Sequence, residues 1–240
     1  MNAIPKDIAA VTIETASVPL ARVDLDLTTG HHGLIVVDEV HGFCTVGRGP
    51  LAPPAPNAQI ERMIAETDRL ARLIGPKLVF RDSHPPGQVE APYPAHCVHG
   101  TGDDMLVDAL AWLETAPLTT VMPKACISGI IGGERPDGSN VVYDWVNHSG
   151  IDTIVVVGIC TDICVLGVVL PLLSARTRGF LGAVDRILVH EPGCATYDLP
   201  LDVARSLGLP DSAAHPQDAF HRMGLLIMQN QGAIITGSAS

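Results

Sequence analysis

Six short runs of β-branched and other apolar residues recur along this chain of 240 residues, and longer stretches of helical character separate them. The runs occupy residues 34–37, 78–80, 119–122, 153–159, 186–189 and 233–236. Continuous apolar runs of this length are typical of strands that are buried on both faces of a sheet. The alternation therefore predicts an α/β fold of the Rossmann-like kind, a six-stranded parallel sheet with helices on both faces.

The stretches between the runs have the period of amphipathic helices. Leu106, Leu110 and Leu113 fall on one helix face, as do the apolar residues between positions 60 and 74. Further helices are expected over residues 140–147, 162–176, 201–207 and 216–229. We expect one domain over residues 1–240, with residues 1–30 as a weakly patterned arm that packs on the body or on another subunit.

Charge and hydropathy exclude several classes of partner. The chain has 15 basic and 26 acidic residues, a formal net charge of −11, so it offers no basic face for nucleic acid. Its longest apolar stretch, residues 163–173, is too short to span a bilayer and contains Pro171, so no membrane partner is expected. The first residues lack the pattern of a secretory signal, which predicts a cytoplasmic protein. High apolar content and the arm favour a homo-oligomer.

Charged and sulfur-bearing residues follow four of the predicted strands. Ligands of parallel sheets bind beyond the carboxyl ends of the strands, so residues at these positions are candidates for a site. They are Asp38 after the first run, Asp82 and His84 after the second, Lys124 after the third, and Cys160 and Cys164 after the fourth. A carboxylate, a metal-type Asp-x-His pair, a lysine and a thiol would then meet at one edge of the sheet.

Two cysteines, four residues apart, occupy the junction between the fourth strand and the next helix. Gly158 permits a tight turn there, and Thr161 and Asp162 are suitable N-cap residues. Cys164 is then expected in the first turn of the helix, where free N–H groups and the helix dipole favour a thiolate nucleophile. The backbone N–H groups of Cys160 and Cys164 are expected to bind an oxyanion. A redox pair or half of a metal site is the alternative interpretation of these thiols.

Separate motifs along residues 33–237 resemble the isochorismatase-like superfamily of cysteine hydrolases. The motifs are DEVHGF from Asp38, Lys124 followed by Ser128, and GICTDICV around Cys164. The resemblance implies an isochorismatase-like hydrolase fold and a catalytic triad of Asp38, Lys124 and Cys164. In this triad Asp38 would be the general base, Lys124 would balance and orient its charge, and Cys164 would be the nucleophile.

A further stretch, RDSHPP followed by YPAHCVHGT, is similar to the nicotinamidase and pyrazinamidase branch of that superfamily. This resemblance implies that Asp82, His84 and His96 bind one divalent metal ion. Two imidazoles and one carboxylate suit zinc, with manganese and iron as alternatives. The stretches GCATYDLPLDVA and HPQDAFHRMGL look most like the plant-type members of this branch. The remaining histidines are expected to be structural or solvated.

The resemblance implies that the chain hydrolyses nicotinamide to nicotinate and ammonia through a thioester on Cys164. It also implies a cis peptide bond between Ile159 and Cys160. Phe43 and Tyr93 are the expected contacts of the substrate ring, because stacking needs a π face. The alternatives are another small-amide or isochorismatase-type hydrolase, a non-catalytic binding protein, and a redox sensor that uses Cys160 and Cys164.

Overall fold

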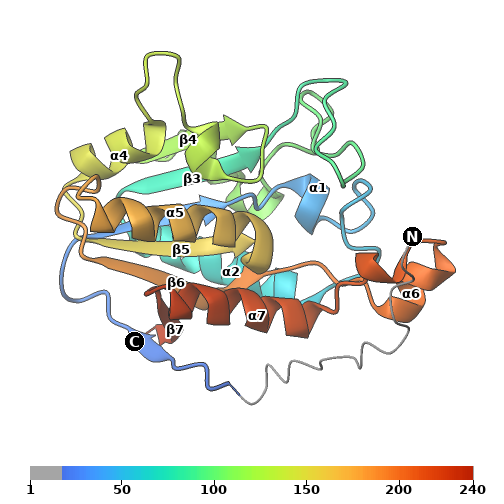
Figure 1. Ribbon diagram of the computed structural model, residues 1–240. Coiled ribbons are helices and arrows are strands. Elements are labelled where there is room, and N and C mark those ends of the chain that lie inside the picture. Colours follow the sequence, from blue (N-terminus) through green and yellow to red (C-terminus); the bar gives the residue numbers. More distant parts are fainter. Residues whose placement is uncertain (1–17, 240) are drawn as a thin grey trace, which may run out of the picture.

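The structure is a computed structural model that describes residues 18–239. Within this range, seven strands form one parallel sheet in the order β1-β7-β6-β5-β2-β3-β4 (Figure 1). The strands are β1 Val23–Leu25, β2 His32–Val37, β3 Lys77–Asp82, β4 Thr119–Lys124, β5 Thr153–Ile159, β6 Arg186–Ala195 and β7 Ile234–Ala239. The predicted α/β class and parallel sheet are confirmed, whereas the predicted number of strands, six, is too low by one.

The additional strand, β1, lies in the segment that we expected to be an arm. Three residues are too few to show a strand pattern in the sequence, and β1 forms by parallel pairing with β7, where Val23 lies opposite Thr236. Leu25 is fully buried, so this part of the predicted arm packs on the body of its own chain. Residues 1–17 of the arm lie outside the described residues.

Helices cover both faces of the sheet (Figure 1). They are α1 His41–Cys44, α2 Ala58–Leu73, α3 Gly129–Gly132, α4 Val141–Ser149, α5 Leu166–Thr177, α6 Leu201–Ser206 and α7 Gln217–Asn230. On the central strand β2, Ile35 and Val37 pack in the core with α4, α5 and α7, while Leu34 and Val36 pack in the core with α2. Between residues 18 and 239, no helix combines the length and the apolar character that crossing a bilayer requires.

The predicted helix that carries Leu110 and Leu113 is a 3₁₀ helix, η2, over Asp108–Thr115. A 3₁₀ helix has three residues per turn, so side chains three apart lie directly above one another. Both leucines are fully buried in the core beside α2. The apolar face was predicted correctly for Leu110 and Leu113, but Leu106 lies before η2 in a bridge with Val40, and the tighter winding was not predicted.

The strands β2 and β5 approach closely where β5 ends. The backbone of Gly158 has φ of 127°, and a Cβ built on it would lie 2.2 Å from the carbonyl oxygen of Val37. No other residue fits this position without displacing β2, because a side chain would overlap the neighbouring backbone. Glycine therefore fixes the place where the chain leaves the sheet toward the two cysteines.

Candidate active site

The carboxyl ends of four adjacent strands bring the predicted residues together. The order β5-β2-β3-β4 places the ends of these strands side by side at one edge of the sheet. Asp38 directly follows β2, Asp82 and Lys124 are the last residues of β3 and β4, and Cys160 directly follows β5. Residues that are distant in the sequence therefore meet because parallel strands share one carboxyl edge.

Asp38, Lys124 and Cys164 lie in contact beneath this edge. The Nζ atom of Lys124 is 2.8 Å from Oδ2 of Asp38 and 4.0 Å from Sγ of Cys164. Their side chains are almost entirely buried, with residue exposures of 0%, 3% and 8% for Asp38, Lys124 and Cys164. Lys124 also donates hydrogen bonds to Oδ1 of Asp82 at 3.0 Å and to the carbonyl of Cys126 at 2.9 Å. An ammonium group thus occupies the centre of the cluster.

Burial and the neighbouring charges determine the protonation of these three groups. Burial raises the pKa of Asp38 to about 6, against the opposing effect of the Lys124 charge. Burial alone would lower the pKa of Lys124, but Asp38, Cys164 and Asp82 raise it well above its usual value. Burial raises the pKa of the Cys164 thiol well above its usual value, although Lys124 opposes this shift. At neutral pH the cluster consequently holds a carboxylate, an ammonium and a neutral thiol, and the thiol needs a base.

We expected Cys164 in the first turn of an α-helix, but it lies ahead of α5. Thr161–Val165 form a single π-helical turn, η3, ahead of α5, and we call this segment the cysteine turn. The N–H groups of Ile163 and Val165 both donate to the carbonyl of Cys160 at 3.0 Å. The wider winding arises because the chain must turn sharply out of β5 before α5 can begin, and π-turns often occur at functional sites.

The predicted capping role of Thr161 and Asp162 is wrong, since neither side chain caps the cysteine turn. The carboxylate of Asp162 instead accepts a hydrogen bond from the Thr196 hydroxyl at 2.6 Å. The peptide bond between Ile159 and Cys160 is cis, as the family resemblance implied. The oxyanion role of the N–H groups of Cys160 and Cys164 stays a prediction.

Asp82, His84 and His96 converge to form a buried group, which we call the metal group. Their exposures are 1%, 1% and 5%, and one ligand atom from each lies within 4.8 Å of the others. Oδ2 of Asp82 is 3.1 Å from Nε2 of His84 and 3.2 Å from Nε2 of His96. Oδ2 of Asp82 and both ring nitrogens of His84 nevertheless lack a hydrogen-bond partner. Buried polar atoms that are close together but unpaired suit a cation between them, so these residues fit a divalent metal ion.

Glu90 also faces the metal group, although it was not among the residues predicted from the sequence. Its Oε2 atom lies 4.0 Å from Nε2 of both His84 and His96, while its Oε1 accepts a hydrogen bond from the N–H of Ile127 at 2.8 Å. One carboxylate oxygen is thus fixed by the backbone, and the other points toward the imidazoles. The sequence could have indicated this residue, because Glu90 is the one acidic residue between the predicted metal ligands Asp82 and His96.

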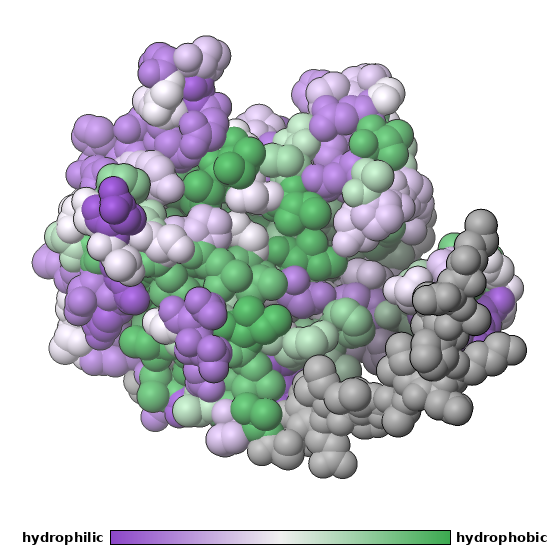
Figure 2. Space-filling model, viewed as in Figure 1, coloured by the Kyte–Doolittle hydropathy of each residue, from purple (hydrophilic) through white to green (hydrophobic). Residues whose placement is uncertain are grey.

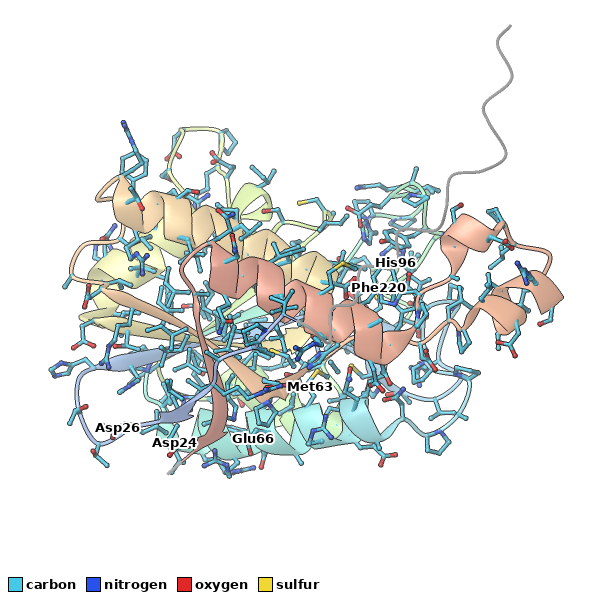
Figure 3. All side chains as sticks on the ribbon, turned by 60° about the horizontal axis from the view of Figure 1, so that its bottom comes forward. Asp24, Asp26, Met63, Glu66, His96 and Phe220 are labelled. Atoms are coloured by element: carbon cyan, nitrogen blue, oxygen red, sulfur yellow. The ribbon has the colours of Figure 1, made fainter. Side chains whose placement is uncertain are left out.

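The two predicted ring contacts, Phe43 and Tyr93, lie against the metal group. Their ring centroids are 5.5 Å and 6.2 Å from the centroid of His96, which Figure 3 labels. Burial raises the pKa of Tyr93, and the neighbouring Cys160 and Cys164 raise it further. Tyr93 therefore lies near both the metal group and the two cysteines. Contact with a substrate ring stays a prediction.

The family model described as the isochorismatase domain matches residues 32–240 of this chain. The chain belongs to the isochorismatase family. This family assignment agrees with the predicted fold and with the place of the predicted motifs at the sheet edge. All six cysteines are free in the described residues, so no disulfide joins Cys160 to Cys164.

Relatives within and around the isochorismatase family show what the chain is similar to. Nicotinamidase 1 of Arabidopsis thaliana is 47% identical over 212 residues, which cover 87% of this chain and 86% of the relative. The pyrazinamidase/nicotinamidase of Streptococcus mutans has a similar fold, with a TM-score of 0.61 at 22% identity over 85% of this chain and 99% of the other. PnC1 of L. infantum, solved in complex with nicotinate, gives a TM-score of 0.64 at 16% identity over 91% and 100% of the two chains.

Proposed function

We propose that the chain is a nicotinamidase, an amidohydrolase that converts nicotinamide to nicotinate and ammonia. The observation that carries the proposal is the 47% identity to Nicotinamidase 1 over 87% of the chain. The contact of Lys124 with both Asp38 and Cys164 supports it, because amide hydrolysis by a thiol needs a base and a nucleophile side by side. Because the Cys164 thiol is neutral, it needs a base, and Asp38 can act as that base.

In the first half-reaction, the Asp38 carboxylate accepts the proton of the Cys164 thiol. The Lys124 ammonium stabilises the thiolate that forms 4.0 Å away, and the sulfur attacks the amide carbon. The N–H groups of Cys160 and Cys164 stabilise the negative oxygen of the tetrahedral intermediate. Protonated Asp38 then gives its proton to the departing nitrogen, so ammonia leaves and a thioester remains on Cys164.

In the second half-reaction, Asp38 accepts a proton from water, and the resulting hydroxide attacks the thioester carbon. The carbon–sulfur bond breaks, nicotinic acid leaves and loses its acidic proton to solvent to become nicotinate, and the proton on Asp38 returns to the sulfur of Cys164. Asp38 thus carries one proton in each direction, which a carboxyl with a pKa of about 6 can do at neutral pH.

Asp82, His84 and His96 would hold the metal ion, with Glu90 as a fourth neighbour. When bound, a divalent ion with open positions supplies a ligand site for water and for the pyridine nitrogen, and so orients the substrate. We propose zinc, because two imidazoles and a carboxylate are a common zinc set, and metal analysis of the purified protein tests this choice. Phe43 and Tyr93 would flank the ring held there.

The test is ammonia release from nicotinamide, pyrazinamide and non-aromatic amides, with and without a chelator. We expect turnover of the pyridine amide, and a higher KM after metal removal. Cys164→Ala should release no ammonia and still bind nicotinamide. Turnover of isochorismate or of aliphatic amides without nicotinamide turnover would instead support another hydrolase of the family. Ammonia release by Cys164→Ala would contradict the nucleophile assignment.

We also propose that the chain forms a homo-oligomer in the cytoplasm. Apolar side chains gather where α5 and α7 face the viewer (Figure 2). Ile163, Leu166, Leu170 and Leu226 in this region are only partly buried, which supports a further partner on this face. Light scattering after size-exclusion chromatography gives the mass in solution. A mass of one chain would contradict self-association.

A further inference from the structure

The carboxylate of Asp162, a residue of the cysteine turn, is paired with an imidazole from a distant segment of the chain. Oδ2 of Asp162 lies 2.8 Å from Nε2 of His215, and Oδ1 accepts the hydrogen bond of Thr196. Asp162 stands two residues before Cys164, whereas His215 lies in the connection between α6 and α7, more than fifty residues later. His215 is 4% exposed, so the pair is largely removed from water. The mechanism above uses neither residue.

The two ring nitrogens of His215 both face oxygen atoms. Nδ1 lies 3.0 Å from the carbonyl oxygen of Tyr197, which can only accept, so this nitrogen carries a hydrogen. Nε2 faces the Asp162 carboxylate. Hydrogen bonds from His215 and Thr196 overcome the effect of burial and lower the pKa of Asp162, so this carboxylate also accepts. Both ring nitrogens therefore face oxygen acceptors, and Nε2 is paired with the Asp162 carboxylate.

The ring of His215 cannot turn away from Asp162. It lies between two aromatic rings, with centroid distances of 3.8 Å to Tyr197 at 15° and 3.9 Å to Phe220 at 27°. The backbone is fixed as well, since Leu199 and His215 exchange two N–H to carbonyl hydrogen bonds at 2.9 Å and 2.7 Å. The imidazole ring is thus held in a fixed orientation beside the cysteine turn.

Helix α7 supports the same turn at two further points. The hydroxyl of Thr161 donates to the carbonyl of Ala195 and so accepts from Nδ1 of His221, at 2.8 Å. A Cβ built on Gly224 would lie 2.9 Å from Cα of Asp162, so the helix backbone packs directly on the turn. The cysteine turn therefore rests on α7 and is tied down by the pair, with Cys164 on the side that faces Asp38.

We infer that His215, through its hydrogen bond with Asp162, is a positioning residue that holds the cysteine turn so that the Cys164 sulfur stays beside Asp38 and Lys124. The inference rests on the proposed function for its effect on turnover. Its effect on the Cys164 thiol itself needs no substrate. His215 touches no reacting group, so its loss should reduce the chemical step and leave substrate binding intact.

The test compares His215→Phe with the wild-type enzyme. Phenylalanine keeps the stack with Tyr197 and Phe220 and removes both ring nitrogens. We expect kcat for ammonia release to fall roughly 10- to 100-fold while KM changes less than about twofold. The alkylation of Cys164 by iodoacetamide, followed on its own peptide by mass spectrometry, should slow by roughly tenfold, because the thiolate is the reactive form. His215→Gln keeps one donor, so its kcat and its alkylation rate should lie between those of the wild type and those of His215→Phe.

His190→Phe is the matched control. His190 is a buried imidazole whose Nε2 lies 2.7 Å from Oε1 of Glu66 and whose Nδ1 lies 2.8 Å from the hydroxyl of Thr236, so both ring nitrogens have partners outside the cysteine turn. Figure 3 shows Glu66 on α2 and Phe220 on α7, on opposite sides of the sheet. This variant should lose stability and keep kcat. A loss of kcat equal to that of His215→Phe would overturn the inference.

Asp162→Asn provides a second test of the same pair if His215→Phe does not fold. It keeps an oxygen for Thr196, removes the charge, and should reproduce the fall in kcat and in Cys164 alkylation. An unchanged or faster alkylation of Cys164 in these variants would overturn the inference. A wild-type protein that releases no ammonia from nicotinamide would contradict the proposed function alone, since the alkylation rates would still test the positioning role.

Discussion

The acidic residues of the site share one ammonium group, that of Lys124. Lys124 is shared between Asp38 at 2.8 Å and Asp82 at 3.0 Å, so one ammonium group serves both the triad and the metal group. Asp82 in turn presents one oxygen to Lys124 and the other to His84 and His96. The pKa of Asp38 remains near neutrality because burial is only partly offset by Lys124.

The acid limb of the pH profile should report Asp38. Its pKa of about 6 means that below this pH the carboxyl is protonated and cannot accept the Cys164 proton. We expect kcat/KM to fall about tenfold for each pH unit below this value, because activity follows the ionised fraction of the base. Asp38→Asn should lose roughly 10²- to 10⁴-fold in kcat at pH 7.5. A profile that stays flat from pH 7 to pH 5 would exclude Asp38 as the base.

Glu90 should contribute to metal affinity. Its free oxygen lies 4.0 Å from both imidazoles, so Glu90→Gln removes a negative charge beside the metal group. We expect the affinity for zinc to fall roughly 10- to 100-fold, the range seen when supporting residues of metal sites are changed. Competition with a chromophoric chelator measures this affinity. Glu134→Gln, at an exposed position, is the control and should change nothing.

Among the helices and strands, those that are buried along their whole length can be predicted from the sequence. All seven residues of β5 are buried, and such runs can be recognised without a structure. β1 was missed because pairing with β7, and not its own three residues, makes it a strand. The π-helical winding of the cysteine turn was missed because its cause, the Gly158 exit and the packing of Gly224 on Asp162, is tertiary. The strand-end residues were predictable, since parallel topology alone brings them together.

Gly158→Ala should be strongly destabilising. The new Cβ would stand 2.2 Å from the Val37 carbonyl oxygen in a backbone with φ of 127°. We expect a loss of on the order of 3 kcal/mol in the free energy of unfolding, measured by urea denaturation. Gly138→Ala is the control, with φ of 81° and open space around it, and should cost only about 1 kcal/mol. Equal losses in the two variants would show that the contact with β2 is unimportant.

For the whole molecule, buried histidines link stability to pH. Burial lowers the pKa of His190, so the folded state binds its proton less readily than the unfolded state does. This contribution to stability is present above the unfolded pKa of about 6.5 and is lost as the pH falls below it. His190→Phe removes the titrating group, so it should lose less stability than the wild type between pH 7.5 and pH 5.5. The midpoints of urea denaturation of both proteins, measured at the two pH values, provide the comparison. An equal change of midpoint in the wild type and in His190→Phe would refute this link between His190 and pH.

The dependence of the cysteine turn on α7 also has a consequence for biosynthesis. A ribosome delivers Asp38, Lys124 and Cys164 long before it delivers Gly224, against which Asp162 packs, and His215, which pairs with it. A nascent chain that already carries every proposed catalytic side chain still lacks the surface on which the nucleophile rests. Emergence of the last helix from the exit tunnel, and not synthesis of the thiol, would then be the moment at which the enzyme becomes active.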